Sequence, residues 1–182
     1  MSATADLRNW AAATARAQLE SLPRRWEHTQ GVARRAERVS PAVDEPDLLV
    51  AAAWLHDVGY APHLVRTGFH PIDGAEFLAE QGVAERLCAL VAHHSCACVE
   101  ARNRGLSIRW TDERTALRDA LWWADMTTTP TGEITDVCER IEEVLERYGA
   151  EHVVARSVAE ASEELLAAAR RTERLLADEV HV

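Results

Sequence analysis

Hydrophobic residues along this chain recur at steps of three and four, which is the spacing of one helix face rather than the alternation of a strand. Glycines stand where these segments end, as Gly59, Gly82 and Gly149 show. Residues 96–110 lack the pattern, and we predict that they are mostly loop. The whole pattern predicts an all-α protein. The predicted helices cover residues 6–22, 24–39, 47–57, 71–81, 83–95, 112–126, 134–148 and 151–179.

Two of these helices carry a polar residue in register with their hydrophobic positions. His28 stands four residues before Val32, and Asp125 stands four residues after Leu121. Residues four apart lie on the same face of a helix, so both side chains are expected to point into the protein. A lone inward-facing histidine is usually a hydrogen-bonded core residue, so neither position identifies a site by itself.

The last predicted helix has hydrophobic positions at an average spacing of 3.5 residues, which is typical of a seam between packed helices. The seam packs either against another helix of this chain or against a second subunit, so a homodimer is one of the two expectations. The seam residues are Val154, Val158, Ala161, Leu165, Ala168, Thr172 and Leu175.

Length and charge narrow the class of protein. The length of 182 residues fits a single all-α domain over residues 1–182. The net charge of −10 argues against nucleic acid as the main partner. No positively charged stretch is followed by a long apolar run, so we expect no signal peptide, no membrane partner and a cytoplasmic location. The four cysteines do not resemble a disulfide framework.

The pair His56-Asp57 is the strongest chemical signal. It directly follows the eight apolar residues Leu48–Leu55, at the end of a helix predicted to be buried. An unpaired buried carboxylate costs several kcal/mol, and a divalent cation would satisfy the aspartate and the histidine together. His28 and Asp125 can complete such a site, because helical bundles often build metal centres from ligands on several helices.

The order His28, His56-Asp57, Asp125 resembles the H…HD…D signature of the HD-domain superfamily of metal-dependent phosphohydrolases. The resemblance covers about residues 23–130. It implies an HD-domain helical bundle with a long C-terminal helix packed on it, the C-terminal helices covering about residues 133–180. It also implies hydrolysis of a phosphate ester or anhydride of a nucleotide or small phosphorylated metabolite by a metal-activated water.

Further histidines resemble the extra ligands of the multinuclear branch of this superfamily. His70 stands at a helix start, and His93-His94 follow at the expected distance. Adjacent helical residues point about 100° apart, so His93 and His94 do not easily face the same ion. The resemblance implies one or two divalent transition-metal ions, bridged by Asp57; Fe, Mn, Co, Ni and Zn all suit such ligands. The predicted ligands are His28, His56, Asp57, His70, His93, His94 and Asp125.

The chain departs from the cyclic-dinucleotide phosphodiesterases of the superfamily, which carry HDIGK and a later GYP motif. Here the string is HDVGY, no GYP follows, and Tyr60 stands where those enzymes have lysine. The chain contains no lysine, so contacts to phosphate fall to arginine. Asp57 is the predicted catalytic residue, which would orient the nucleophile. The predicted substrate-binding residues are Arg24, Arg25, Arg66 and Thr128.

Two other functions remain compatible with the same residues. Some proteins of this fold hold a di-iron centre and oxygenate small organic molecules, and a histidine-rich ligand set permits that chemistry. A non-catalytic sensor or binding module could also retain the metal.

Overall fold

The protein is described by a computed structural model that covers residues 3–179. Within these residues it is built from α-helices and short 3-10 turns, with no strand, which confirms the all-α prediction. Residue 180 and the predicted domain ends, residues 1 and 182, lie outside the described residues. The α-helices are α1 (Ala3–Leu19), α2 (Pro23–Val39), α3 (Pro46–Leu55), α4 (His70–Glu80), α5 (Glu85–Ala92), α6 (Ala97–Asn103), α7 (Ala116–Met126), α8 (Val137–Tyr148) and α9 (Val153–Glu179).

Local chemistry fixes several helix ends. Proline occupies the first turn of α2, α3 and α4, where its fixed φ suits a helix and its missing N–H is not needed. Asp136 accepts a hydrogen bond from a backbone N–H of α8 and forms a capping box with Glu139. Gly149, with φ of 76°, follows the last residue of α8. These signals account for the close agreement between most of the predicted helix boundaries and the observed ones.

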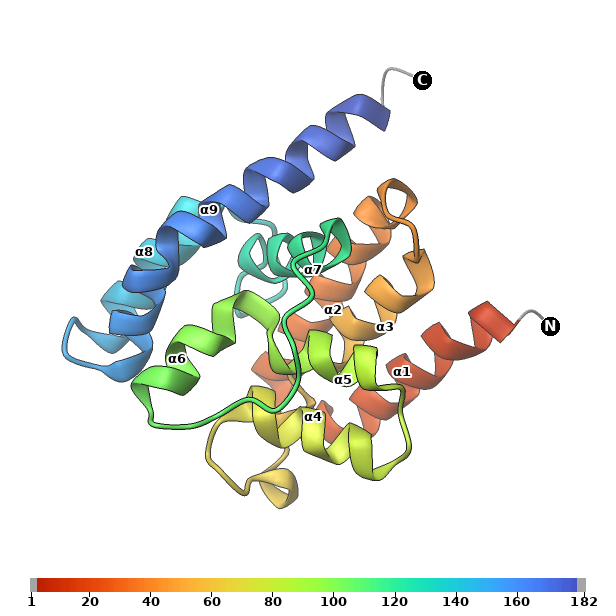
Figure 1. The fold of residues 1–182 in the computed structure, drawn as a ribbon, viewed down its shortest axis with the longest axis horizontal. Coiled ribbons are helices and arrows are strands. Elements are labelled where there is room, and N and C mark those ends of the chain that lie inside the picture. The colour runs from red at the N-terminus through yellow and green to blue at the C-terminus, as the bar shows by residue number, and fades with distance from the viewer. Residues whose placement is uncertain (1–2, 180–182) are drawn as a thin grey trace.

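The central helix α3 is the core of the bundle. Its residues 51–53 are alanines with no exposed surface, and α1, α2, α5 and α7 pack against it (Figure 1). A helix that is apolar on every side is stable only when other helices surround it. The residues that follow α3, His56 and Asp57, are therefore delivered to the interior of the protein.

The long C-terminal helix α9 packs on α6, α7 and α8 of the same chain and runs along one edge of the molecule (Figure 1). Seam positions such as Ala161, Leu165 and Ala168 are buried there. A partly buried ion pair joins α9 to α7, since Nε of Arg171 donates to Asp119 at 2.6 Å. The predicted seam thus packs within the chain, and the long helix lies on the bundle as expected.

The prediction of a loop over residues 96–110 was wrong in its first half. Residues 97–103 form α6, whose Ala97 and Ala101 are buried in a small apolar cluster with Phe69 and Ile72. These two alanines are four residues apart, which puts them on one face of the short helix. The segment is too short and too rich in polar residues for that pattern to stand out in the sequence.

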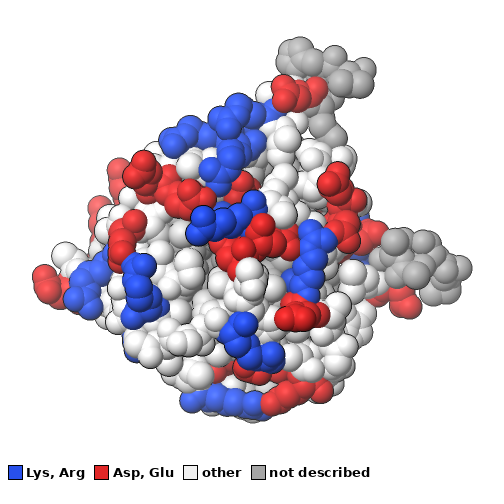
Figure 2. Space-filling model, in the orientation of Figure 1, with Lys and Arg blue, Asp and Glu red and all other residues white. Residues whose placement is uncertain are grey.

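Charged side chains of both signs are interspersed on the surface, as Figure 2 shows for one face. Many of the arginines are paired with acidic residues; Arg109, for example, lies 2.8 Å from Glu76. Such exposed pairs add little to stability. In the part of the chain that the structure describes, no helix combines the length and the apolar character needed to cross a membrane.

Gly59 is the point of closest approach between the turn after α3 and helix α4. A Cβ atom at this position would lie 2.0 Å from the carbonyl oxygen of His70 and 2.6 Å from the backbone nitrogen of Gly74. Backbone atoms cannot rotate away as a flexible side chain can, so only glycine fits. This contact sets the position of the first residue of α4 relative to Asp57.

We predict that Gly59→Ala lowers the free energy of unfolding in urea by about 3 kcal/mol, because the added methyl group overpacks a backbone contact. Gly82→Ala is the control, since that position has open space around its Cβ and a φ of 74°. Only the left-handed backbone is penalised there, at about 1 kcal/mol. Equal losses for the two variants would contradict the proposed role of Gly59.

Candidate metal centre

Six of the predicted ligands converge at the ends of helices in the middle of the bundle. Each is buried except His70, whose side chain is 19% exposed. They come from five elements that are far apart in sequence. The six are His28 on α2, His56 and Asp57 after α3, His70 at the start of α4, His94 in the 3-10 turn His94–Cys96, and Asp125 near the end of α7.

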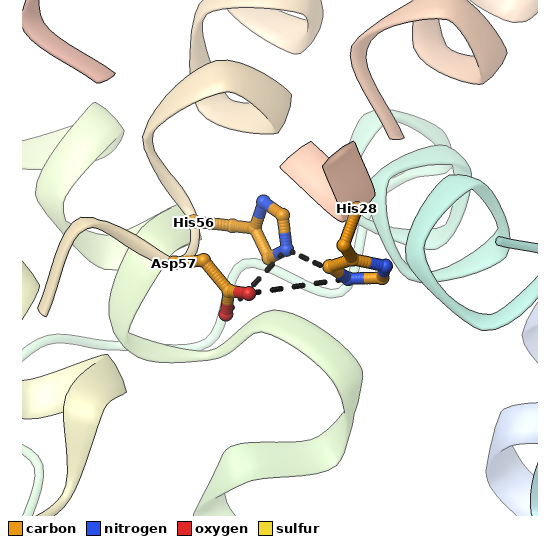
Figure 3. Close-up of side chains that lie close together, drawn as sticks. All are labelled: His28, His56 and Asp57. Carbon is orange, nitrogen blue, oxygen red and sulfur yellow. Dashed lines mark hydrogen bonds and ion pairs between the residues drawn. The ribbon is translucent and has the colours of Figure 1, made fainter. Parts of the chain in front are cut away.

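A first cluster forms around His28, His56 and Asp57, whose side chains point toward one another (Figure 3). The Nε2 atom of His56 lies 3.4 Å from Nε2 of His28 and 3.6 Å from Oδ1 of Asp57. Asp125 completes the group, with Oδ1 at 3.0 Å from Nε2 of His28. Ligand atoms about 2.1 Å from one ion lie at most about 4.2 Å apart, so these spacings suit a single transition-metal ion.

A second cluster shares Asp57 with the first. The Nε2 atom of His70 lies 3.3 Å from Oδ1 of Asp57 and 3.1 Å from Nε2 of His94. These three side chains also offer ligand atoms within 4.8 Å of one another. One carboxylate therefore faces both groups of histidines, which is the arrangement required of a bridging ligand.

Hydrogen bonds to the backbone orient three of the imidazole rings. The Nδ1 atoms of His28, His56 and His94 lie 3.0, 2.7 and 2.6 Å from the carbonyl oxygens of Thr129, Ala53 and Val91, respectively. A carbonyl oxygen can only accept, so each Nδ1 carries a proton, and in its neutral form each ring presents the lone pair of Nε2 to the centre.

The centre is consequently rich in acceptors and poor in donors. Nε2 of His28 faces Nε2 of His56, and both face aspartate oxygens, which are also acceptors when ionised. A cation resolves this conflict, because it takes up all the inward lone pairs together. The donor set of imidazole nitrogens and carboxylate oxygens thus fits a divalent transition-metal ion.

Charge keeps both aspartates ionised. Burial raises the pKa of Asp57, but the nearby His56 and Arg25 outweigh it and hold this pKa well below its usual range. Burial likewise raises the pKa of Asp125, and its hydrogen bond with His28 and the charges of the neighbouring histidines more than reverse the effect. Both carboxylates are therefore in the form that binds metal.

The histidines differ in protonation. Burial lowers the pKa of His70 and of His94, which favours the neutral rings that act as ligands. Burial also lowers the pKa of His28, but the hydrogen bond to Asp125 and the charges of Asp125 and Asp57 together outweigh it, and the net pKa is raised. A cation that binds at His28 therefore replaces the proton that this pair of residues would otherwise share.

Arg25 and Tyr60 form a layer beside the second cluster. Nη1 of Arg25 donates to Oδ2 of Asp57 at 3.2 Å, and its guanidinium lies 3.7 Å from the centre of the Tyr60 ring. Tyr60 stacks on His70 with ring centroids 3.9 Å apart. Its pKa is raised, chiefly by burial, so the phenol stays neutral. The residue that replaces the lysine of HDIGK thus holds a ligand ring and an arginine in place.

Ser95 is a site residue that sequence reasoning missed. Its hydroxyl donates a hydrogen bond to Oδ2 of Asp125. The backbone of Ser95 has φ of 46°, a left-handed conformation that is uncommon outside glycine. The sequence shows only that this serine follows His94, and nothing in the helical pattern indicates the kink that turns its hydroxyl toward Asp125.

His93 is the predicted ligand that the structure places apart from both clusters. Its Nε2 lies 2.8 Å from the carbonyl oxygen of Trp110 in the segment before α7. Because α5 ends at Ala92 and the chain kinks at Ser95, the adjacent histidines point in different directions. His94 joins the second cluster, whereas His93 fastens the segment that contains Trp110.

The predicted substrate-binding residues do not lie together. Arg24 is exposed, and Arg66 is exposed and paired with Glu80. The hydroxyl of Thr128 donates to the carbonyl oxygen of Ala124 at 2.7 Å, a contact at the C-terminal end of α7. The structure thus gives these three side chains no place at the clusters and leaves Arg25 as the predicted arginine that touches one.

A cavity of about 270 Å³ opens beside the clusters, and we call it the metal cavity. His28, Asp57 and His94 contribute to its wall together with Arg25. Its other wall comes from elements outside the clusters, which no sequence signal connected with the site. These residues include Glu100, Arg104, Arg140, Val144, Arg147, Tyr148, His152, Val154 and Val158.

We predict that His94→Ala weakens binding of a second metal ion at least about tenfold, as loss of a ligand should. His93→Ala is a matched control, since its ring binds a backbone carbonyl instead of facing Asp57. The check is the metal content of each purified variant by plasma emission after loading with Mn²⁺. Loss of metal from His93→Ala, with full metal in His94→Ala, would reverse the assignment.

The HD domain family model matches residues 25–176. Comparisons with curated proteins and with solved structures find no match. The matched segment contains every residue of both clusters and continues past residue 130 into α9, so the family pattern includes the C-terminal helices. Because the match covers most of the chain, the protein belongs to the HD-domain superfamily.

Proposed function

We propose that this protein hydrolyses a phosphate ester or anhydride of a nucleotide or another small phosphorylated metabolite. The observation that carries the proposal is the pair of His/Asp clusters that share Asp57 at the wall of a small cavity. Phosphoryl transfer needs mainly positioned charge rather than covalent catalysis, and this arrangement suits that need.

The proposed ligands divide between two ions. His28, His56, Asp57 and Asp125 would hold the first, and Asp57, His70 and His94 the second. Divalent ions bound there would act as Lewis acids on the phosphate and lower the pKa of water. Iron, manganese, cobalt, nickel and zinc are all compatible with the ligands, and we leave the choice among them to experiment.

Asp57 is the proposed catalytic residue. Its Oδ1 faces His56 and His70, while its Oδ2 accepts from Arg25. A carboxylate fixed on both sides can hold an attacking water in one orientation toward the phosphorus. Ser95 plays a comparable part for Asp125, whose second oxygen it holds by a hydrogen bond.

Arg25 is the arginine best placed to meet the phosphate. Its side chain is 31% exposed, lines the metal cavity and is supported on the ring of Tyr60. The planar guanidinium can donate to two phosphate oxygens at once. An arginine carried on Tyr60 thus offers positive charge in the region where HDIGK enzymes have their lysine, and the absence of that lysine argues against cyclic dinucleotides as substrates.

We predict phosphate release from at least one compound of a nucleotide and phosphometabolite panel when Mn²⁺, Co²⁺, Ni²⁺ or Fe²⁺ is supplied. Asp57→Ala should lower kcat/KM by about a thousandfold, because it removes a ligand shared by both ions and the group that orients the nucleophile. Arg24→Ala is the control with a surface arginine and should keep full activity.

Two results would contradict the proposal. Oxygen uptake with an organic substrate, without phosphate release in any metal, would indicate a di-iron oxygenase. Metal binding without turnover of any kind would indicate a sensor or binding module.

A further inference from the structure

One side of the metal cavity is formed by helices that contribute nothing to the clusters. On α8, Arg140, Val144 and Arg147 follow one another at steps of four and three, so they share the face that lines the cavity. Arg104, directly after α6, also lines the cavity, and Val158 of α9 adds an apolar surface. This wall combines positive charge with apolar side chains.

The arginines of this wall are not fully neutralised by the protein. Arg104 has its own partner, Glu100, at 2.7 Å. Arg140 and Arg147, by contrast, share the single carboxylate of Glu143. The three arginines of this wall therefore carry one positive charge more than their two acidic partners, in a protein whose net charge is −10.

Arg140 is the more constrained of the two. Its side chain is only 11% exposed, and its Nε is buried with no hydrogen-bond partner among the described residues. A buried N–H without an acceptor is costly, more so when the group is charged. Exposed Arg109 shows the usual alternative, since its Nε and Nη2 donate to the two oxygens of Glu76. An anion that enters the cavity would instead be held by the guanidinium groups of Arg140 and Arg147, which have only one carboxylate between them.

The rest of the wall suits a short apolar or planar body. Tyr148 and His152 stack with ring centroids 4.9 Å apart, and Val144 and Val158 stand near them in the lining. The volume of about 270 Å³ limits the ligand to a small molecule. A ligand that reaches from the clusters to this wall would meet cations at one end and arginines at the other.

We propose that Arg140 and Arg147 form a second anion subsite. It selects small metabolites that carry a second anionic group, a carboxylate or another phosphate, besides the phosphate that is hydrolysed. The inference rests on the proposed phosphohydrolase function, since the clusters take the scissile phosphate. The C-terminal helices thus set the substrate preference, and the elements that carry the clusters supply the chemistry.

The first test compares hydrolysis of phenyl phosphate, 4-carboxyphenyl phosphate and 1,4-phenylene bisphosphate by the Mn²⁺-loaded protein. We expect kcat/KM to be at least about tenfold higher for one or both doubly anionic probes, the gain from one charge-assisted contact. Arg140→Gln and Arg147→Gln should each shrink this preference while leaving phenyl phosphate hydrolysis nearly unchanged. Because the wild type and the variants hydrolyse the same three probes, differences in leaving-group reactivity cancel when their preferences are compared.

The control is Arg156→Gln, since Arg156 is exposed on α9 and is absent from the cavity lining. It should keep the wild-type preference. A wild-type protein without any preference for the doubly anionic probes, or a preference that survives in both cavity variants, would overturn the subsite. The probe that loses most in the variants identifies whether carboxylate or phosphate is the second group.

The second test does not depend on activity. Inorganic phosphate is titrated into the metal-free protein by calorimetry, where no metal ion attracts it and Arg25 is the same in every variant, so a difference between variants reports on the arginine wall. We expect binding that weakens at least about fivefold in Arg140→Gln and Arg147→Gln but not in Arg156→Gln. Equal binding by all four proteins, or none by the wild type, would overturn the subsite. If phosphate binding is lost only in the two cavity variants but the protein hydrolyses no phosphate ester, the anion subsite is supported and the proposed phosphohydrolase function is refuted.

Discussion

The middle of this bundle depends on neutralising two buried carboxylates. Asp57 and Asp125 are 2% and 7% exposed, and most of their neighbours are imidazoles that present lone pairs rather than protons. Arg25 reaches only one oxygen of Asp57. Removing a carboxylate from water is expensive unless a positive charge replaces the solvent, and a divalent cation does this for both residues together. Core stability and capacity for chemistry therefore rest on the same interaction.

The fold meets this constraint by ending helices at the clusters. The central helix α3 stops at Leu55, α4 begins at His70 and α7 ends at Met126, so the chain changes direction where ligands are needed. Ligands at helix ends can approach from several directions, which a single helix face does not allow. Gly59 permits the tightest of these approaches, because its missing side chain lets the turn after α3 pack on the backbone of α4.

Helical spacing was sufficient to predict the all-α fold and the inward faces of His28 and Asp125, because the period of a helix fixes which side chains share a side. It indicated that His93 and His94 diverge but not which of them faces the clusters, since that depends on where α5 ends and on the left-handed kink at Ser95. It also gave Arg140 no special meaning. On α8 that residue looks like any charge of an amphipathic helix, and only the docking of α8 beside the clusters brings it to the cavity.

The central claim is that the clusters hold two divalent ions bridged by Asp57. Anomalous diffraction from crystals grown with Mn²⁺ tests it most directly. Two peaks are expected about 3.5–4 Å apart, a separation usual for paired catalytic ions, both within bonding distance of Asp57. No peak, a single peak that leaves His70 and His94 without metal, or metal bound only outside these residues would contradict it.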